Sequence, residues 1–502
     1  MASKINLKSA NFWSLLTAVS SAILSFLTAG LAVKLLPAAD AGLILITGSI
    51  ISMIDAIGGL GIREATIRRL SRLFIEGNLD DVELIFSSSV FVVIGLYGSI
   101  CICGYFFSST IISLVSYPDL ETGRLFIGLM LLVLFAQQLA AQLTMTFQTA
   151  QRYRLSSMHS MTINGMTVVG SYVALIVSES MLVLAIVRAV FVVLFLSYLL
   201  LDPFGIRPCR MRVLFSLKES LSMLAYGKSI LASKIVALSI NGLDRVLFVG
   251  AFGLNMLPIY ALPRRMFEVA HRLLCQQSSY LFPVMSSGGK MTSFRFFEKV
   301  RWEYSCIGAL MYSGMACFGS SVLALMVDSV FAEEAGRYVL AFSIVGFIQS
   351  FEIVLMPYAK AIGRPHFNFY AKSVASVAIV VPMYCYSKYT DSIDLFTSAQ
   401  VGIVFSPVLL SLMLFGRRRS LRILTEMIKS PVGVCSASFV LMFFIDECYG
   451  LRMALVLKSL VFVSVVLVTA VLEVYVIKNP RAVKCLDTLI GSLRSNVKAV
   501  MN

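Results

Sequence analysis

The sequence predicts an all-α polytopic membrane protein, and two observations carry this prediction. Of the 502 residues, 58% are hydrophobic and only 14% are charged, whereas about a quarter of the residues of a soluble protein are charged. The apolar residues form runs of about 20, which is the length of a helix that crosses a bilayer. Short basic clusters separate these runs, so we attribute the net charge of +15 to membrane topology and expect no nucleic-acid partner.

About fourteen apolar runs are candidate membrane-spanning helices. In chain order they cover residues 12–36, 42–62, 86–115, 124–147, 158–178, 180–201, 227–250, 257–283, 302–327, 336–358, 367–387, 395–416, 431–446 and 451–477. The first run follows Lys4 and Lys8, as in a signal peptide. It exceeds the roughly 7–15 residues of a signal-peptide core and a second run follows directly, so we expect an uncleaved helix.

The distribution of basic residues predicts the orientation. If the N-terminus lies in the cytoplasm, only four of the 42 Lys and Arg residues fall on the outer side: Arg124, Arg337, Lys388 and Arg452. Cytoplasmic loops carry an excess of Lys and Arg. We therefore expect fourteen crossings with both termini in the cytoplasm.

Two pairs of segments indicate an internal duplication. LLPAADAGLILITGSI (35–50) pairs with AFGLNMLPIYALPRRM (251–266), and LTMTFQTAQRYRLSSMHS (143–160) pairs with VLMPYAKAIGRPHFNFYA (354–371). The members of each pair share one direction and one depth, as in a parallel repeat about an axis along the membrane normal.

The repeat predicts the domain organisation. We expect one six-helix bundle over residues 1–206 and a second over 207–416. The remaining residues, 417–502, would form a final helix pair and a cytoplasmic tail, joined to the second bundle by the Arg-rich segment 416–430.

Charged residues concentrate in two neighbouring spans, 227–250 and 257–283. A charge at a helix centre costs about 2.5–3.5 kcal/mol, so such a cluster is expected to face water, a partner or a substrate. With a neutral histidine, the cluster carries a net charge of +4: Lys228, Lys234, Asp244, Arg245, Arg264, Arg265, Glu268, His271 and Arg272. This excess of cations favours an anionic substrate.

Each of the two spans carries polar residues on one helical face. On the first span these residues are Lys234, Asn241 and Arg245. On the second they are Arg265, Glu268 and Arg272. Spacings of i, i+7, i+11 and of i, i+3, i+7 each follow one side of a helix, so both faces could line a water-filled cleft.

Structural alternatives exist for several of these residues. Asp244, Arg245 and Lys34 are near the outer ends of their spans and could reach interfacial water, and Lys228 could snorkel at an inner end. A second alternative makes Glu268 only the ion partner of a nearby arginine three or four residues away: Arg264, Arg265 or Arg272. The ring of His271 could be purely structural.

A second tier of intramembrane polar residues comprises Gln138, Gln142, Gln349 and Glu352. Such residues also bond neighbouring helices to one another, at about 0.6 kcal/mol each. The ten cysteines form no CxxC pair, and we expect neither a metal nor a cofactor.

Three segments carry a resemblance to a known family. The run NGLDRVLFVGAFGLNMLPIYALPRRM (241–266) resembles the segment at which polysaccharide flippases begin their second half. LLPAADAGLILITGSIISMIDAIGGLGIREATIRRLS (35–71) is similar to its first-half counterpart, and AIGRPHF (361–367) to the Gly-Arg turn after the tenth helix. The resemblance extends over essentially the whole chain and is to the O-antigen and oligosaccharide-lipid flippases of the multidrug/oligosaccharidyl-lipid/polysaccharide exporter superfamily.

The resemblance implies a function and a site. It implies export of an undecaprenyl-pyrophosphate-linked oligosaccharide across a bacterial inner membrane, through a V-shaped cavity between the two bundles, with membrane lipid, a polymerase and other export proteins as partners. Arginine and lysine suit a pyrophosphate, and the substrate-binding candidates are Arg265, Arg272, Lys234, Arg264, Arg245, Asn241 and Lys34. The candidates for ion coupling are Asp55, Glu268, His271 and Asp244.

Two alternative functions make different demands on the chain. An ion-coupled multidrug exporter would need an acid in the N-terminal half, and Asp55 is the only candidate in the first two spans. A polysaccharide polymerase or glycosyltransferase would need outer loops that hold a donor and a catalytic acid or base. The expected outer loops 37–41, 251–256 and 388–394 are too short for this, so we expect a transporter without catalytic residues.

Overall fold

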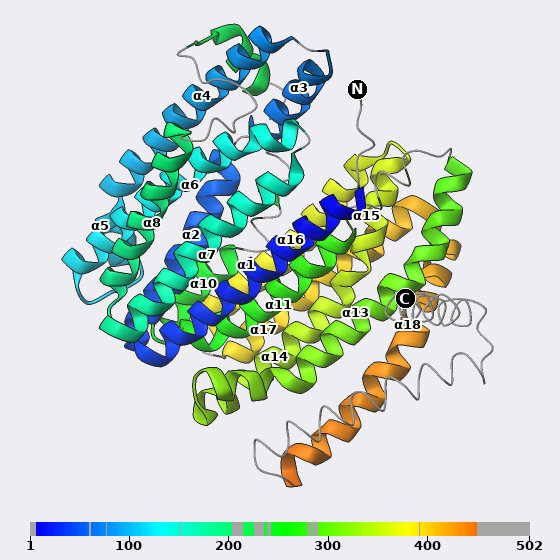
Figure 1. The fold of residues 1–502 in the computed structure, drawn as a ribbon. Helices are drawn as coiled ribbons and strands as arrows, with labels where there is room; N and C mark the ends of the chain where they lie inside the picture. The colour runs from blue at the N-terminus through cyan, green and yellow to red at the C-terminus, as the bar shows by residue number, and fades with distance from the viewer. Residues whose placement is uncertain are drawn as a thin grey trace, which may run out of the picture.

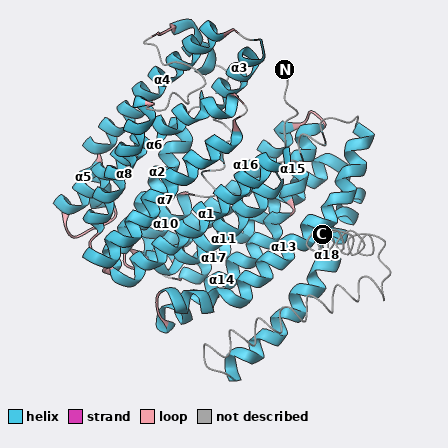
Figure 2. Cartoon of the chain, viewed as in Figure 1, coloured by secondary structure: helices cyan, strands magenta, loops and turns pink. Residues whose placement is uncertain are grey.

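The computed structural model describes most of the chain between residues 7 and 448. The residues outside the description are 1–6, 60–61, 77, 151, 203–213, 225–234, 237, 239–241, 279–280, 282–284, 286–289, 391 and 449–502. Throughout the described ranges the regular structure is helical (Figure 2), which confirms the predicted all-α class.

The helices follow one another with short turns. The first eight are α1 (Leu7–Leu35), α2 (Ala38–Gly58), α3 (Ile62–Glu76), α4 (Leu79–Phe106), α5 (Ser108–Leu114), α6 (Leu120–Thr149), α7 (Tyr153–Ser178) and α8 (Met181–Leu201). The later ones are α10 (Leu243–Phe252), α11 (Leu257–Gln277), α13 (Lys290–Met326), α14 (Ser329–Ser350), α15 (Glu352–Ala361), α16 (Pro365–Tyr389), α17 (Ile393–Ser398), the 3₁₀ helix η2 (Ala399–Val404) and α18 (Phe405–Cys448).

Within the described ranges, nine helical segments are long and apolar enough to cross a membrane. Helix α1 has a shorter apolar stretch, 19–35. Helix α11 is not among the nine because Arg264, Arg265, Glu268 and Arg272 interrupt its apolar sequence. The total of fourteen crossings stays a prediction, since the last expected span, 451–477, lies outside the described residues.

Helix α3 lies between the expected spans 42–62 and 86–115, where no helix was predicted. Its four arginines lower its hydropathy, yet its apolar residues recur at helical spacing. Ile62, Ala65 and Leu70 form a buried face on this amphipathic helix. Periodicity, and not mean hydropathy, therefore predicts α3.

Several helices extend beyond the apolar run that predicted them. Helix α4 begins at Leu79 instead of 86, where the Asn78 side chain accepts a hydrogen bond from the backbone N–H of Asp81 at 3.3 Å. Helix α13 begins at Lys290 instead of 302. Hydropathy marks the part of a helix that lies in lipid, whereas hydrogen bonding and capping decide where the helix starts.

The expected linker 416–430, for which no helix was predicted, lies within helix α18. Gly416 has φ of 72° and ψ of 168°, which breaks the helical path, and the chain then continues as a helix to Cys448. A glycine fits this position because a side chain is disfavoured at positive φ. The expected span 431–446 is thus part of the helix that starts with the Arg-rich segment.

The helices form two groups that meet at one end of the molecule (Figure 1). Helices α2 to α8 make the first group and α10 to α18 the second, and α1 packs against both α7 and α11. The ribbons lie apart where α3 and α15 are found, an end that we call the α3 end, and come together at the α1–α2 and α10–α11 turns.

The junction between the groups is tight at these turns. A Cβ atom added to Gly42 of α2 would lie 2.4 Å from the carbonyl oxygen of Leu254, in the α10–α11 turn. Apolar side chains of α2, such as Ala41 and Leu45, belong to the same buried core as Tyr260 and Phe342 of the second group. The two groups therefore share a packed core at this end.

Candidate functional site

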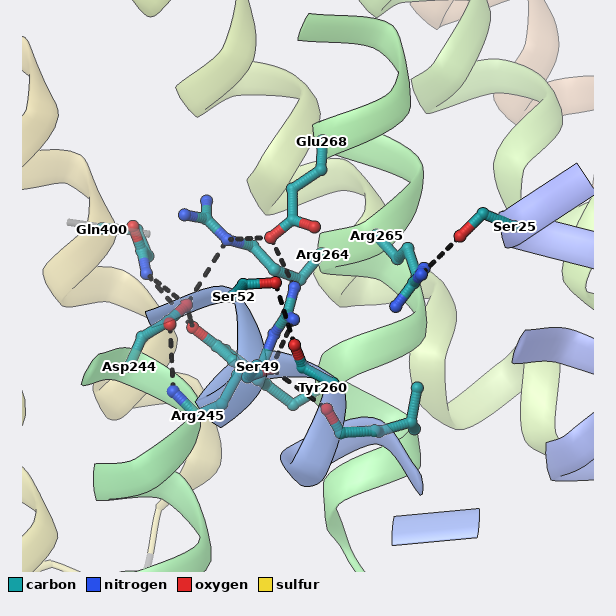
Figure 3. A network of polar contacts seen from close by, with 12 residues as sticks. Ser25, Ser49, Ser52, Asp244, Arg245, Tyr260, Arg264, Arg265, Glu268 and Gln400 are labelled. Carbon is teal, nitrogen blue, oxygen red and sulfur yellow. Dashed lines mark hydrogen bonds and ion pairs between the residues drawn. The ribbon is translucent and has the colours of Figure 1, made fainter. Parts of the chain in front are cut away.

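Charged side chains of α10 and α11 form a buried network at the junction of the two groups (Figure 3). Asp244 lies at its base, where its Oδ2 accepts hydrogen bonds from the Tyr260 hydroxyl at 2.9 Å and from Gln400 Nε2 at 3.4 Å. The Nε of Arg264 is 3.4 Å from the same oxygen. Tyr260 and Gln400 come from α11 and η2, so one carboxylate connects three elements.

A second carboxylate completes the network. Arg245 of α10 forms an ion pair with Glu268 of α11, and its Nη1 donates to Ser49 Oγ of α2 at 2.6 Å. The Nε of Arg264 is 3.8 Å from Glu268 Oε1, so this guanidinium lies between the two carboxylates. Two acids and two bases balance, and the network adds no net charge.

Burial and aromatic rings hold Arg264 in place. Only 1% of Arg264 is exposed, and its guanidinium carbon lies 4.7 Å from the ring centroid of Phe267 and 5.3 Å from that of Phe342. A cation over an aromatic face is attracted by the ring quadrupole. The residue is thus enclosed by rings and carboxylates, an environment that suits a structural charge.

This geometry changes the interpretation of four candidates. The alternative that Asp244 and Arg245 reach interfacial water is wrong, since only 1% and 5% of these residues are exposed. Glu268 does pair with Arg264, as one alternative held, but it also pairs with Arg245, which sequence spacing did not suggest. Buried guanidiniums with carboxylate partners do not fit a substrate-facing role, so we interpret Arg245 and Arg264 as part of a structural network.

Arg265, the next residue on α11, has different surroundings. It is partly exposed, and its Nη2 donates to Ser25 Oγ of α1 at 2.5 Å (Figure 3). Its electrostatic neighbours are Glu268 and two further arginines, Arg245 and Arg272. The side chain of Arg272 is exposed. Arg265 therefore points away from the buried network and toward α1.

A further arginine, which sequence analysis missed, lies close to Arg265. Arg188 of α8 is near enough for the two guanidiniums to repel each other, and its Nε donates to Ser171 Oγ of α7 at 2.7 Å. The sequence does mark this residue, because Arg188 is the only charged residue in the apolar run 180–201. Arg188, Arg265 and Arg272, which we call the arginine cluster, thus bring cations from both helix groups together.

The other predicted substrate-binding residues do not join the arginine cluster. Lys34 is exposed in the last turn of α1 and contacts none of the charged residues above. Lys234 and Asn241 lie outside the described residues, so the predicted polar face of their span is untested.

Asp55 and His271 are the ion-coupling candidates outside the network. The Oδ1 of Asp55 accepts a hydrogen bond from the Tyr97 hydroxyl of α4 at 2.7 Å. His271 stacks on Phe267 with ring centroids 5.7 Å apart, and its Nδ1 is 3.3 Å from the Tyr312 hydroxyl. Both are therefore satisfied polar groups between helices.

The second-tier residues divide between structural contacts and a pocket. Gln142 Nε2 donates to Ser89 Oγ at 2.7 Å and so joins α6 to α4. Glu352 is buried 3.9 Å from the Lys372 ammonium, and Gln349 is buried as well. Gln138 lines a pocket in the first helix group. Among the described residues, no group of three or more His, Cys, Asp or Glu side chains could hold a metal ion.

Comparison with known proteins gives a family and a fold. The family model described as polysaccharide biosynthesis protein matches residues 31–290. No curated protein matches the chain. The similar solved structures include membrane transporters and a lipid flippase.

Three of these structures illustrate the likeness. The lipid II flippase MurJ, in an inward closed conformation, is 11% identical with a TM-score of 0.72 over 92% of this chain and 99% of that chain. An inward-facing multidrug resistance MATE family transporter of the MOP superfamily is 14% identical, with a TM-score of 0.65 over 82% of this chain and 99% of that chain. A variant of the Vibrio cholerae MATE transporter VcmN is 12% identical, with a TM-score of 0.60 over 84% of this chain and 96% of that chain. At these identities the likeness shows the fold.

Proposed function

The chain belongs to the polysaccharide biosynthesis protein family, and we propose that it flips an undecaprenyl-pyrophosphate-linked oligosaccharide from the cytoplasmic to the outer leaflet of a bacterial inner membrane. The family and the fold make it a multi-pass membrane protein of the flippase and transporter type. The lipid-linked substrate, the direction and the alternating-access mechanism are the proposed part.

The arginine cluster is the observation that carries the proposal. Because Asp244 and Glu268 balance Arg245 and Arg264, the three arginines of the cluster are a local excess of positive charge. A pyrophosphate offers several oxygens, and each guanidinium can donate two parallel hydrogen bonds to them. Since the cluster draws on α8 and α11, a bound anion would bridge the two helix groups.

The arrangement of the groups supports alternating access. They are packed together at the α1–α2 and α10–α11 turns and lie apart at the α3 end, which the basic residues predict to be cytoplasmic. The head group would enter from that end while the prenyl tail stays in lipid. Rocking of the groups about α1 would then open the opposite end.

The membrane potential favours this direction of transport. A cell interior that is negative drives anions outward, and each charge moved through 100 mV is worth about 2.3 kcal/mol. Asp55 and His271 are the groups that we propose for any proton coupling, because Asp244 and Glu268 are already committed to arginines.

A second candidate function, ion-coupled multidrug export, has one supporting observation. Asp55 is an acid in the first helix group with a tyrosine donor, the type of group that a coupling ion would need. The arginine cluster argues against it, because a cationic drug would be repelled there.

Deletion of the gene in its host tests the proposal. We expect lipid-linked oligosaccharide to accumulate on the cytoplasmic side and surface glycan to fall, and expression of the intact chain to reverse both. The control is a strain that cannot make the lipid-linked precursor, in which deletion should have no effect. Normal surface glycan combined with greater sensitivity to drugs would favour multidrug export instead.

A further inference from the structure

The first helix group contains a polar pocket that the arginine cluster does not explain. Its volume is about 260 Å³, and it lies between α6, α7, α8 and the start of α3. Six polar side chains and one aromatic ring dominate its lining: Arg63, Gln137, Gln138, Thr144, Ser160, Asn164 and Phe195. We call it the amide pocket.

Within the described ranges, five of the six polar side chains of the amide pocket have no protein partner; the exception is Thr144, whose hydroxyl donates to the Ala141 carbonyl at 3.1 Å. None of the five is hydrogen-bonded or ion-paired to another residue within the described ranges. Gln142, one turn further along α6, shows the contrast, because its amide is bound to Ser89. A partly buried amide without a partner costs stability, so several such groups around one space indicate a site for a polar ligand.

The chemistry of the lining selects the class of ligand. Three amides and the Ser160 hydroxyl can each donate and accept hydrogen bonds, the Thr144 hydroxyl can still accept one, and Arg63 adds a bidentate donor. The lining contains no carboxylate, which does not suit a metal or a cationic drug. Phe195 and Ile163 supply an apolar surface. Hydrogen-bonding edges around an apolar face match a sugar ring, neutral or acidic.

The position of the pocket relates it to the arginine cluster. Asn164 precedes Ser171 by seven residues on α7, and Phe195 follows Arg188 by seven residues on α8. Seven residues are two helical turns, so each pair lies on one helix face with a rise of roughly 10 Å. Ser171 binds Arg188, and the amide pocket is therefore displaced about two turns from that pair toward the α3 end.

We propose that the amide pocket binds a sugar near the reducing end of the glycan while the arginine cluster holds its pyrophosphate. This inference rests on the proposed function and names which part of the substrate the first helix group recognises. The pocket accounts for specificity between glycans, because the pyrophosphate and the prenyl tail are common to all such substrates. A sugar with a different pattern of hydroxyl or acetamido groups would leave amides unpaired.

Binding to the purified protein in nanodiscs tests the inference with two probes. One probe is the lipid-linked oligosaccharide pool extracted from the deletion strain, and the other is undecaprenyl pyrophosphate without sugar. For the double variant Gln138→Ala with Asn164→Ala, we expect the Kd for the oligosaccharide lipid to rise about tenfold. The Kd for the sugar-free lipid should stay unchanged. Thr162→Ala is the matched control, because Thr162 is exposed on α7 and its hydroxyl donates to the Met158 carbonyl of the same helix.

Two other outcomes of the binding measurement would contradict the inference. Equal weakening for both lipids would indicate general damage to the fold, and unchanged binding of both would show that the pocket holds no sugar. Either result overturns the inference and leaves the proposed function standing, because the wild type binds both lipids. If the wild type binds neither lipid, the proposed function itself fails.

Discussion

Arg245 of α10 forms an ion pair with Glu268 of α11, 23 residues further along the chain. Together with Asp244 and Arg264, this pair places four charges in the packed junction between the two helix groups. Of the described charges that first suggested a substrate pathway, these four thus form a balanced structural network, whereas Arg265 and Arg272 belong to the arginine cluster. We expect substitutions in the network to change stability and substitutions in the arginine cluster to change transport.

Removing one member of the Arg245–Glu268 pair should destabilise the protein. Arg245→Leu leaves a carboxylate without its main partner, and stranding a buried charge costs about 3–5 kcal/mol. Arg245→Leu with Glu268→Leu should be close to the wild type, because the Arg264–Asp244 pair remains balanced. Thermal unfolding in detergent and the level of protein in membranes measure both. A double variant as unstable as the single one would contradict the structural role.

Arg265 should matter for transport and not for folding. Its partner in the protein is a serine hydroxyl, so Arg265→Ala strands no carboxylate and should leave the level of membrane protein unchanged. Surface glycan should fall at least tenfold, and Arg265→Lys should recover only part of it because the bidentate fork is lost. The measurement is surface glycan per unit of membrane protein.

Ser25→Ala is the matched control for that variant. It removes the hydrogen bond to Arg265 but keeps the charge, so we expect only a small decrease in surface glycan. A loss as large as that in Arg265→Ala would mean that the orientation of α1, and not the charge, is what the substrate needs.

Arg188→Ala tests whether the arginine cluster extends to the first helix group. If Arg188 shares the pyrophosphate with Arg265, its loss should weaken binding of undecaprenyl pyrophosphate about as much as Arg265→Ala does. Salt should reduce the difference between wild type and variant, because it screens exposed charges. Tighter binding on removal of Arg188 would show that repulsion from Arg265 is its main effect.

Gly42 should be intolerant of a side chain. An added Cβ would meet the Leu254 carbonyl at 2.4 Å, and backbone atoms cannot move aside as a flexible side chain can. Gly42→Ala should therefore disturb the packed end and reduce transport. Gly48→Ala, on the same helix with open space around it, should be neutral or stabilising by about 0.5–1 kcal/mol. Equal effects of the two variants on transport would argue against a close junction at Gly42.

Cysteine labelling tests the predicted orientation. Arg418 and Glu334 are both exposed and belong to segments predicted to be inner and outer. In a chain freed of its native cysteines, an impermeant reagent applied to intact cells should label Glu334→Cys and not Arg418→Cys. The reverse pattern would place the N-terminus outside.

Hydropathy and basic bias predicted much of the fold but not its helix ends. The apolar runs correspond to helices over most of the described chain, because burial in lipid requires both apolar side chains and internal backbone hydrogen bonds. The amphipathic α3 and the helical segment 417–430 were missed, since their arginines lower the hydropathy of segments that nevertheless form helices.

The charged residues of the site could be predicted from the sequence, but which of them form ion pairs could not. An excess of cations on α11 can be counted from the sequence, whereas the Arg245–Glu268 pair depends on how α10 and α11 are rotated about their axes. Spacing along one helix cannot give that rotation. Arg188 could have been found by the rule that a lone intramembrane charge marks a candidate site.

Flipping by the purified protein in liposomes tests the central claim most directly. Wild-type protein should move the lipid-linked oligosaccharide of the deletion strain between leaflets, as measured by its accessibility to a glycan-modifying enzyme added outside. Arg265→Ala should abolish this movement, whereas Thr162→Ala should not. Wild-type liposomes that flip no more oligosaccharide lipid than protein-free liposomes, or an Arg265→Ala variant as active as the wild type, would contradict the account.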